Sequence, residues 1–436
     1  MWTVGYHTLG CKVNQYDTQA MEELLSSAGF RTVPFSGDAD VYLVNTCTVT
    51  GTGDKKSLQL ARRLKREHPG CLLVLCGCLA QLKGAELLDA GADLVIGTQY
   101  RGRIVSLLRQ VIETGKPVSA VEPLPDNMPY EPLHVTAHEG RTRAVIKIQE
   151  GCRNRCSYCI IPDVRGPIRS RPLEDIRAEA ESLARSGFRE VVLTGIHISS
   201  YGKDTDSDVS LCDVLGMLEH TDGILRVRLG SLEPNIATAA FAEELRQYSK
   251  LCPQFHLALQ SGSDSVLRRM RRQYRMDGYY RAVEHLRSVF PLAALTTDIL
   301  TGFPGETEEE YEETRDVIRK VGFSRIHVFP YSPRPGTPAA DMPCQLDEAL
   351  KQQRSRELIQ LGKEVSFCYQ RQWVGRETVV LPEEQADGCW EGYSPEYLRV
   401  RLEPGVEYES GKPVQVLIQD VTPRYLRGVR ISSIGG

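Results

Sequence analysis

The three cysteines of segment 151–159 are the residues of this chain best suited to chemistry. Cys152, Cys156 and Cys159 form a C-x3-C-x2-C run that also contains Tyr158. One short loop cannot bury three separate side chains, and soft thiolates suit zinc or an iron–sulfur cluster. Structural zinc takes four ligands, usually from two Cys-x2-Cys halves, and the sequence contains no second half. We therefore predict a four-iron cluster with one iron left open to bind a small molecule.

A second group of three cysteines is predicted from the order of elements and not from a local motif. Residues 1–115 alternate apolar runs with helix-like segments, which predicts a small doubly wound α/β domain with a parallel sheet. Ligands of such sheets bind beyond the carboxyl ends of the strands, and Cys11, Cys47 and Cys78 each follow a predicted strand. We expect these thiols to meet at one rim, with inert packing of any one of them as the alternative. Cys76 lies inside an apolar run and is expected to be core.

The elements of this N-terminal part follow from where the apolar runs begin and end. The expected strands are Thr3–Tyr6, Val41–Val44, Leu72–Leu75 and Leu94–Ile96. The expected helices are Val13–Ser27, Lys55–Glu67, Ala80–Leu88 and Arg103–Glu113. Residues 116–140, which contain several prolines, are then predicted to be a stiff, extended linker.

Residues 141–370 are predicted to form a partial (β/α)6 barrel, because six strand–helix units follow one another without a seventh or eighth. The expected strands are Ala144–Gln149, Glu190–Thr194, Leu225–Leu229, Phe255–Leu259, Leu295–Leu300 and Arg325–Phe329. In such barrels the functional residues lie in the loops after the strands. The cysteine loop follows the first strand, as this rule requires.

Polar or glycine-rich groups follow other strands of the predicted barrel. They are Thr194–His197, Ser231–Pro234, Gln260–Gly262 and Thr301–Gly305. Each short motif alone is typical of a loop turn. Because they stand at matching places in successive units, together they favour a ligand-binding mouth.

The C-terminal residues 371–436 contain five short strand-like runs, after a helix expected at about 347–369. This pattern predicts a small β-barrel of the oligonucleotide-binding type, with a purely structural barrel as the alternative. Arg424, Arg427 and Arg430 could face a phosphate backbone there.

Two denser basic patches also follow predicted strands. They are Lys55, Lys56, Arg62, Arg63, Lys65 and Arg66, and Arg268, Arg269, Arg271, Arg272 and Arg275. A solvated surface is the common reason for such runs. Around a cluster-bearing mouth, however, they would suit an anionic macromolecule such as RNA.

The composition sets limits on the class of protein. The chain has 436 residues, of which 41% are apolar and 25% charged, and its net charge of −4 gives no global signal for nucleic acid. We expect no signal peptide, and no apolar run approaches the ~18 residues of a membrane span. Thirteen cysteines in such a chain favour metal or redox chemistry over disulfides. We expect a cytoplasmic protein without membrane contact, in which scattered cysteines are small buried hydrophobes: Cys212, Cys252, Cys344, Cys368 and Cys389.

The cysteine loop, with Tyr158 inside it, resembles the S-adenosylmethionine (SAM)-binding loop of radical SAM enzymes. Other segments are similar to the radical SAM methylthiotransferases: Thr8–Gln15, Asn45–Cys47, Gly77–Gln81, His256–Asp264, Asp298–Thr307 and Tyr331–Thr337. Residues 371–436 resemble the RNA-binding TRAM domain. The resemblance covers essentially the whole chain in order.

The resemblance implies two 4Fe–4S clusters and SAM as cofactors. The implied ligands are Cys152, Cys156 and Cys159 for the radical-generating cluster, and Cys11, Cys47 and Cys78 for an auxiliary cluster that supplies sulfur. SAM would lie across the strand ends near Gly195, Ser231, Glu233 and Gln260. The implied partners are the tRNA anticodon arm and an electron donor such as a flavodoxin or ferredoxin.

Two segments, Thr8–Asn14 and Thr194–Gly202, are most similar to one branch of this family. That branch adds a methylthio group to C2 of N6-threonylcarbamoyladenosine beside the tRNA anticodon. The alternatives are the branch acting on isopentenyl-adenosine, which typically has Gln where His197 stands, and the branch acting on a ribosomal protein aspartate. A non-enzyme alternative is an iron–sulfur electron carrier or RNA-binding protein, although an electron carrier usually has fully ligated clusters.

Overall fold

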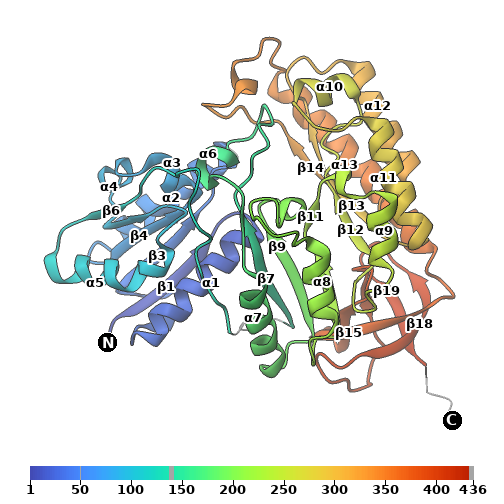
Figure 1. Cartoon of the computed structure of the whole chain (residues 1–436), viewed down its shortest axis with the longest axis horizontal. Coiled ribbons are helices and arrows are strands. Elements are labelled where there is room, and N and C mark those ends of the chain that lie inside the picture. The colour runs from blue at the N-terminus through green and yellow to red at the C-terminus, as the bar shows by residue number, and fades with distance from the viewer. Residues whose placement is uncertain (50, 137–141, 432–436) are drawn as a thin grey trace.

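Residues 1–49, 51–136 and 142–431 are described by a computed structural model, which places an N-terminal α/β part beside a partial barrel (Figure 1). A small β-barrel follows at the C-terminal end. Four pieces of the predicted segments lie outside the described residues: 50 of the N-terminal α/β segment, 137–140 of the linker, 141 of the partial barrel and 432–436 of the TRAM-like barrel. The segment boundaries themselves stay a prediction.

The N-terminal sheet is parallel, and its strands run in the order β2-β1-β3-β4-β5-β6. The strands are β1 (Thr3–Thr8), β2 (Arg31–Val33), β3 (Val41–Thr46), β4 (Leu72–Gly77), β5 (Leu94–Ile96) and β6 (Val118–Ala120). The helices are α1 (Lys12–Ser27), α2 (Gly51–Glu67), α3 (Cys78–Lys83), α4 (Glu86–Asp89) and α5 (Ile104–Thr114). Apolar clusters cover both faces of the sheet, so the central strand β3 is buried along its whole length and β4 is buried except at Leu72. The predicted doubly wound α/β architecture is confirmed.

Two features of this part differ from the sequence prediction. The helix expected at Ala80–Leu88 is interrupted at Gly84, whose positive φ of 54° ends α3 and separates it from α4. The edge strands β2 and β6 were not expected, because each has only three residues and none of them is buried.

The barrel strands are parallel and lie in two sheets, ordered β10-β9-β7-β8 and β11-β12-β13-β14. The six main strands are β7 (Arg143–Glu150), β9 (Glu190–Gly195), β10 (Arg226–Leu229), β12 (Gln254–Leu257), β13 (Ala294–Thr301) and β14 (Arg325–Pro330). A bridge between Val227 and Leu251 joins the two sheets. Shorter strands are β8 (Arg169–Ser170), which is antiparallel to β7, and β11 (Ser231–Leu232). The predicted partial barrel is confirmed.

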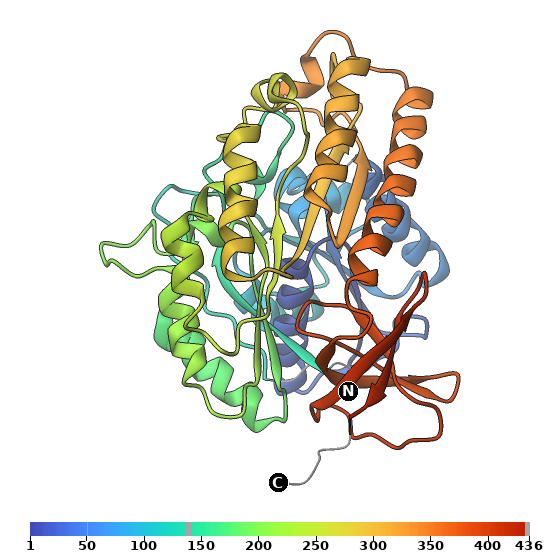
Figure 2. The same ribbon diagram turned by 90° about the vertical axis from the view of Figure 1, so that its right-hand side faces the viewer.

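Helices cover the outer face of these strands (Figure 2). They are α7 (Leu173–Arg185), α8 (Leu211–Glu219), α9 (Ala239–Leu245), α11 (Met276–Val289), α12 (Glu308–Val321) and α13 (Glu348–Arg371), with the short α6 (Ile161–Arg165) and α10 (Asp264–Arg269) between strands and helices. Their starts follow from capping residues: Thr307 forms a capping box with Glu310, and the Asp347 side chain accepts a hydrogen bond from the Leu350 N–H. One large apolar core joins helices and strands.

The C-terminal strands close into a barrel in the order β15-β16-β17-β19-β18. They are β15 (Glu377–Ala386), β16 (Cys389–Tyr393), β17 (Arg399–Arg401), β18 (Val414–Val421) and β19 (Leu426–Arg430). Closure removes the open edges that such short strands would otherwise expose. The prediction of a small C-terminal β-barrel is confirmed.

The scattered cysteines are not all core residues. Cys212 and Cys252 are buried as expected and Cys389 is half-buried, but Cys344 and Cys368 are exposed, so the expectation is wrong for these last two. Cys368 lies on a solvent-facing position of α13, and Cys344 lies in a loop with a positive φ of 59°. Within the described ranges, no helix is long and apolar enough to cross a membrane.

Candidate active site

The three N-terminal cysteines lie at one rim of the first sheet. Cys11 precedes α1 after β1, Cys47 follows β3, and Cys78 opens α3 after β4. These three strands are neighbours in the sheet, so their carboxyl ends meet. Gly10 has a φ of 101°, and a Cβ there would lie 2.9 Å from the Cys47 Cβ, so glycine allows the Cys11 loop to approach Cys47 closely.

Cys11 lies close enough to Cys47 and Cys78 to raise the pKa of each of these two thiols. Burial raises the pKa of Cys78 to about 11, and the neighbouring Cys11 and Cys47 add to the rise against the Arg165 guanidinium. Burial and then Cys11 likewise raise the pKa of Cys47. The structure thus brings the three together, as the topology predicted. We call them the auxiliary site, and their role as cluster ligands stays a prediction.

The cysteine loop after β7 depends on a glycine at its start. Gly151 has a φ of 74°, and a Cβ there would lie 1.7 Å from the Pro167 carbonyl oxygen, which excludes any side chain. The Cys152 N–H donates to the Gly166 carbonyl at 3.0 Å, and the Cys159 N–H donates to the Cys156 carbonyl at 3.1 Å. These two bonds fold the loop back on itself. We call Cys152, Cys156 and Cys159 the radical site.

Segments from the far side of the barrel hold this loop in place. The Ser157 hydroxyl donates to the Arg269 carbonyl at 2.7 Å, and the Ala339 N–H donates to the Ser157 carbonyl at 2.8 Å. Tyr158 packs edge-on against Phe303, with 6.4 Å between ring centres. The loop is therefore fixed by the barrel itself.

Arg272 connects the loop to one of the predicted SAM contacts. Its Nη1 donates to Cys156 Sγ at 3.3 Å, and its Nη2 donates to both carboxylate oxygens of Glu233, at 2.8 and 2.6 Å. The sequence predicts Arg272 and Arg269 as members of a basic patch that is either solvated or faces RNA at the mouth. The structure corrects this, because Arg272 is buried and Arg269 is paired with Glu310 at 2.6 Å.

The other predicted SAM contacts also lie at strand ends of the mouth. Gly195 ends β9, and exposed Ser231 opens β11. Gln260 has a φ of 63°, and its N–H donates to the Asp298 carbonyl at 2.9 Å, which links the loop after β12 to the middle of β13. The structure places Glu233, Gly195, Ser231 and Gln260 on the side of the barrel that carries the cysteine loop, and their contact with SAM stays a prediction.

His197 stands beside Glu233 in the same mouth. Its N–H donates to the Gln149 side chain at 2.7 Å, and its Nε2 lies 3.8 Å from a Glu233 oxygen. Burial lowers the pKa of His197, although Glu233 opposes this, so the ring is neutral near pH 7. Its Nε2 is a buried atom without a hydrogen-bond partner in the described part of the chain, which leaves it available to a ligand.

The donor atoms of both sites fit iron–sulfur clusters. Among residues 1–49, 51–136 and 142–431, no three His, Cys, Asp or Glu side chains converge closely enough for a single metal ion. A cluster spans a wider space, since it is held by thiolates spread around it. N–H donors contact sulfurs in both sites, and such bonds orient metal ligands: Asn154 N to Cys152 Sγ at 3.4 Å, Arg272 to Cys156 and Arg165 to Cys78.

Comparison with known sequences gives two family matches and full-length relatives. Residues 146–318 match the Radical SAM superfamily, and residues 3–97 match the uncharacterized protein family UPF0004. Threonylcarbamoyladenosine tRNA methylthiotransferase MtaB of Bacillus subtilis (strain 168) is 42% identical, covering 96% of this chain and 94% of the relative. The relative of that name in Thermotoga maritima is 38% identical, covering 92% and 91%. A tRNA-2-methylthio-N(6)-dimethylallyladenosine synthase of Pelotomaculum thermopropionicum is 36% identical, covering 98% and 95%.

Comparison with solved structures shows the fold. The radical S-adenosylmethionine methyltransferase TsrM from Kitasatospora setae, with cobalamin and a 4Fe–4S cluster bound, aligns with a TM-score of 0.58 at 16% identity. That alignment covers 78% of this chain and 77% of TsrM. The cobalamin-dependent radical enzyme OxsB aligns with a TM-score of 0.52 at 12% identity, covering 83% of this chain and 56% of OxsB.

Proposed function

Because the chain belongs to the radical SAM tRNA methylthiotransferases, we propose that it adds a methylthio group to C2 of N6-threonylcarbamoyladenosine beside the tRNA anticodon. The observation that carries this proposal is the pairing of two three-cysteine sites across the barrel mouth, on a chain similar along its length to relatives of that name. Two relatives named for dimethylallyladenosine are 36% and 39% identical, the second over a smaller share, 86% of this chain and 70% of the relative, and both are below the 42% of the Bacillus subtilis relative.

The reaction needs cofactors, because adenine C2–H is not acidic and its carbon is a poor electrophile. When bound, the clusters and SAM supply a radical at the radical site and sulfur at the auxiliary site. The chain's own residues hold and orient these groups. Arg272 connects Cys156 to Glu233. The hydrogen bond from the Ser157 hydroxyl to the Arg269 carbonyl fixes the loop of the radical site to the barrel.

The N-terminal part contacts barrel loops on both sides of the mouth. Arg165, after β7, contacts Cys78, and Arg334, after β14, donates to Asp54 and Thr48. Arg334 is buried by these contacts. We infer that the N-terminal part covers the mouth and presents the auxiliary site to the base that enters it.

A groove beside the C-terminal barrel is the surface that we propose for the anticodon arm. The groove has a volume of about 770 Å³. Its lining includes the cations Arg325, Lys363, Arg399 and Arg424 and the rings Phe367, Tyr393, Tyr397 and Tyr425. Cations with interleaved aromatic rings suit a phosphate backbone and unstacked bases.

The groove lies away from the two cysteine sites. It borders the beginnings of β13 and β14, whereas the cysteine loop follows the end of β7. Since a strand rises about 3.3 Å per residue, the eight residues of β13 separate its ends by roughly 25 Å. The groove would therefore hold the backbone of the arm while the extruded base enters the mouth.

Replacing Lys363 and Arg424 together with glutamine should weaken tRNA binding and reduce its salt dependence. Each lost phosphate contact should lower the slope of log affinity against log salt by about 1. Fluorescence anisotropy with labelled tRNA at several salt concentrations measures both quantities. Arg185→Gln, an exposed arginine of α7, is the matched control and should change neither. An unchanged slope in the double variant contradicts the assignment of the groove.

The substrate is tested in cells that lack the gene. Mass spectrometry of tRNA nucleosides should show N6-threonylcarbamoyladenosine without its methylthio group, restored by the wild-type gene. A missing methylthio group on isopentenyl-adenosine, or an unmodified ribosomal protein aspartate, would favour the other branches. SAM cleavage by the reduced protein would exclude an electron carrier or a purely RNA-binding protein.

Two further proposals follow from this reaction. Since the substrate is tRNA, we place the enzyme in the cytoplasm, which cell fractionation with an antibody to the chain tests.

The radical site needs one electron per SAM cleaved, and a flavodoxin or ferredoxin is the donor that we propose. Purified flavodoxin and ferredoxin can be compared by the rate at which they support SAM cleavage. If neither supports it, the proposed electron donor is wrong.

A further inference from the structure

The helix that follows the cysteine loop packs against the auxiliary site. Ile160, the residue after Cys159, and Val164 of α6 form an apolar cluster with Cys78. The Thr98 hydroxyl also donates to the Val164 carbonyl at 2.7 Å. One short segment of the barrel therefore carries a radical-site cysteine and contacts the auxiliary site.

Arg165 ends this helix and is fully buried. Its Nε donates to Cys78 Sγ at 3.2 Å. Its Nη1 donates to Glu150 at 2.9 Å and to Asp17 at 3.1 Å, and its Nη2 donates to Asn14. Each nitrogen of the guanidinium thus has a partner. The bonds of Nη1 and Nη2 fix the orientation in which Nε donates to Cys78 Sγ.

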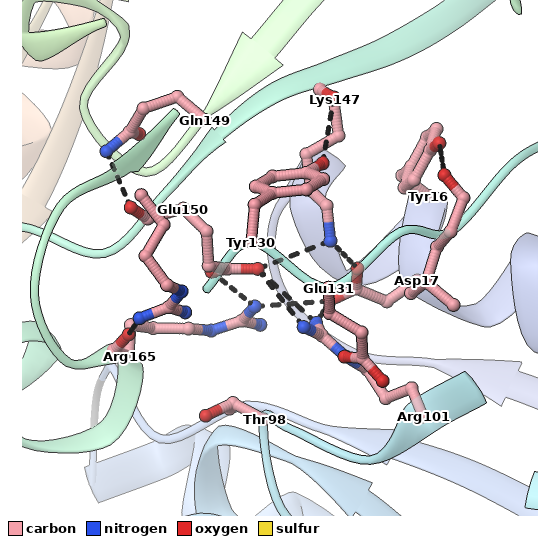
Figure 3. Close-up of polar contacts among 12 residues, drawn as sticks. Tyr16, Asp17, Thr98, Arg101, Tyr130, Glu131, Lys147, Gln149, Glu150 and Arg165 are labelled. Carbon is pink, nitrogen blue, oxygen red and sulfur yellow. Dashed lines mark hydrogen bonds and ion pairs between the residues drawn. The ribbon is translucent and has the colours of Figure 1, made fainter. Parts of the chain in front are cut away.

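A balanced network of charges surrounds this guanidinium (Figure 3). Asp17 contacts Lys147 and Arg101, and Glu150 contacts Lys147 at 3.2 Å and Arg101 at 3.4 Å. Arg101 also contacts Glu131 at 2.8 Å. With Arg165, three cations face three carboxylates. Burial alone would raise the pKa of Glu150, but Arg165, Lys147, Arg101 and the nearby Arg169 outweigh it and hold that pKa well below its usual range.

Resting on the proposed function, we propose that Arg165 is a positioning residue of the auxiliary cluster, which holds Cys78 Sγ by a hydrogen bond and raises the cluster's reduction potential. A guanidinium N–H gives a charge-assisted bond to a thiolate. Hydrogen bonds to cluster sulfurs favour the more negative, reduced state, and are among the factors that set the potential. Because the donor comes from the radical segment, it also fixes the auxiliary site relative to the radical site.

The test isolates the auxiliary cluster. In a full-length background with Cys152, Cys156 and Cys159 replaced by alanine, the reconstituted protein should hold only that cluster. Arg165→Met should shift its midpoint potential, followed by EPR during redox titration, to a more negative value, or remove its iron. Arg165→Lys keeps the positive charge but lacks the planar guanidinium that donates to several partners at once. The shift of the midpoint potential in this variant should therefore be smaller than in Arg165→Met.

Two controls separate this role from a general effect on folding. Arg155→Gln removes an exposed arginine of the same cysteine loop, which pairs with Asp163 at 2.9 Å, and should leave the potential unchanged. In the reciprocal background, with Cys11, Cys47 and Cys78 replaced by alanine, Arg165→Met should leave the EPR signal of the radical site unchanged.

Each outcome decides either the proposal or its premise. An auxiliary cluster with unchanged iron content and potential in Arg165→Met overturns the proposal and leaves the proposed function standing. If Arg165→Met does not fold, Arg165→Lys decides, and an unshifted potential in that variant overturns the proposal. If the isolating background holds no cluster at all, the ligand assignment fails, and the proposal fails with it.

Discussion

Replacing Cys11, Cys47 and Cys78 together with alanine should abolish methylthio transfer and leave SAM cleavage in place. The two activities separate because the loop of the radical site is anchored by barrel groups, the Arg269 carbonyl and the Ala339 N–H, and not by the N-terminal cysteines. Iron in the reconstituted variant should fall by about half, since one of two clusters is lost. Product 5′-deoxyadenosine and modified tRNA nucleosides, both quantified by mass spectrometry, measure the two activities.

Cys76→Ala is the matched control for this experiment. Cys76 lies on β4, two residues before Cys78, and its buried thiol contacts the Val44 carbonyl at 3.7 Å. Its loss should cost some packing energy, on the order of 1 kcal/mol, and leave both clusters in place. Loss of SAM cleavage in the triple variant, or methylthio transfer that survives it, would contradict the division of roles between the two sites.

Asp17→Asn should destabilise the protein by about 3–5 kcal/mol, because it breaks a buried network of ion pairs. The Asp17 side chain is 2% exposed and faces three cations: Arg101, Lys147 and Arg165. In Asp17→Asn the three cations lose one of the carboxylates that neutralise them, and water does not reach the site to solvate them instead. The midpoint of urea unfolding, followed by circular dichroism, measures the loss.

The effect of pH follows from the sign of the pKa shift. Burial would raise the pKa of Asp17, but Arg101, Lys147 and Arg165 together lower it below its ordinary value of 3.8. The stabilisation by Asp17 is therefore complete above that value and is lost as the pH falls through the lower pKa of the folded state. The difference between wild type and Asp17→Asn should shrink in strong acid.

A surface pair provides the comparison for this prediction. Asp316 pairs with Arg319 at 2.9 Å on the exposed face of α12. Asp316→Asn should cost less than about 1 kcal/mol, because solvent screens an exposed pair. Equal effects of the two substitutions would contradict the predicted contribution of the buried network to stability.

The positions of the strands and of the cysteine loop could be predicted because their signals are local. An apolar run of six residues or a C-x3-C-x2-C spacing is complete within a short stretch of sequence. The shared rim at the ends of β1, β3 and β4 could be inferred, since parallel strands with helical connections place their carboxyl ends at the same edge of the sheet. This was enough to bring Cys11, Cys47 and Cys78 to one rim without any motif that joins them.

By itself, the sequence determined the fold class, the two groups of three cysteines and the family resemblance. Only the tertiary structure decided which arginines donate hydrogen bonds to these cysteines. Arg165 and Arg272 meet their sulfur partners across 87 and 116 residues of chain, and Arg272 stands in the sequence as one member of a basic run. A cation has no local pattern that tells a solvated position from a buried one. Its partner is set by packing between distant elements, and packing exists only in the folded chain.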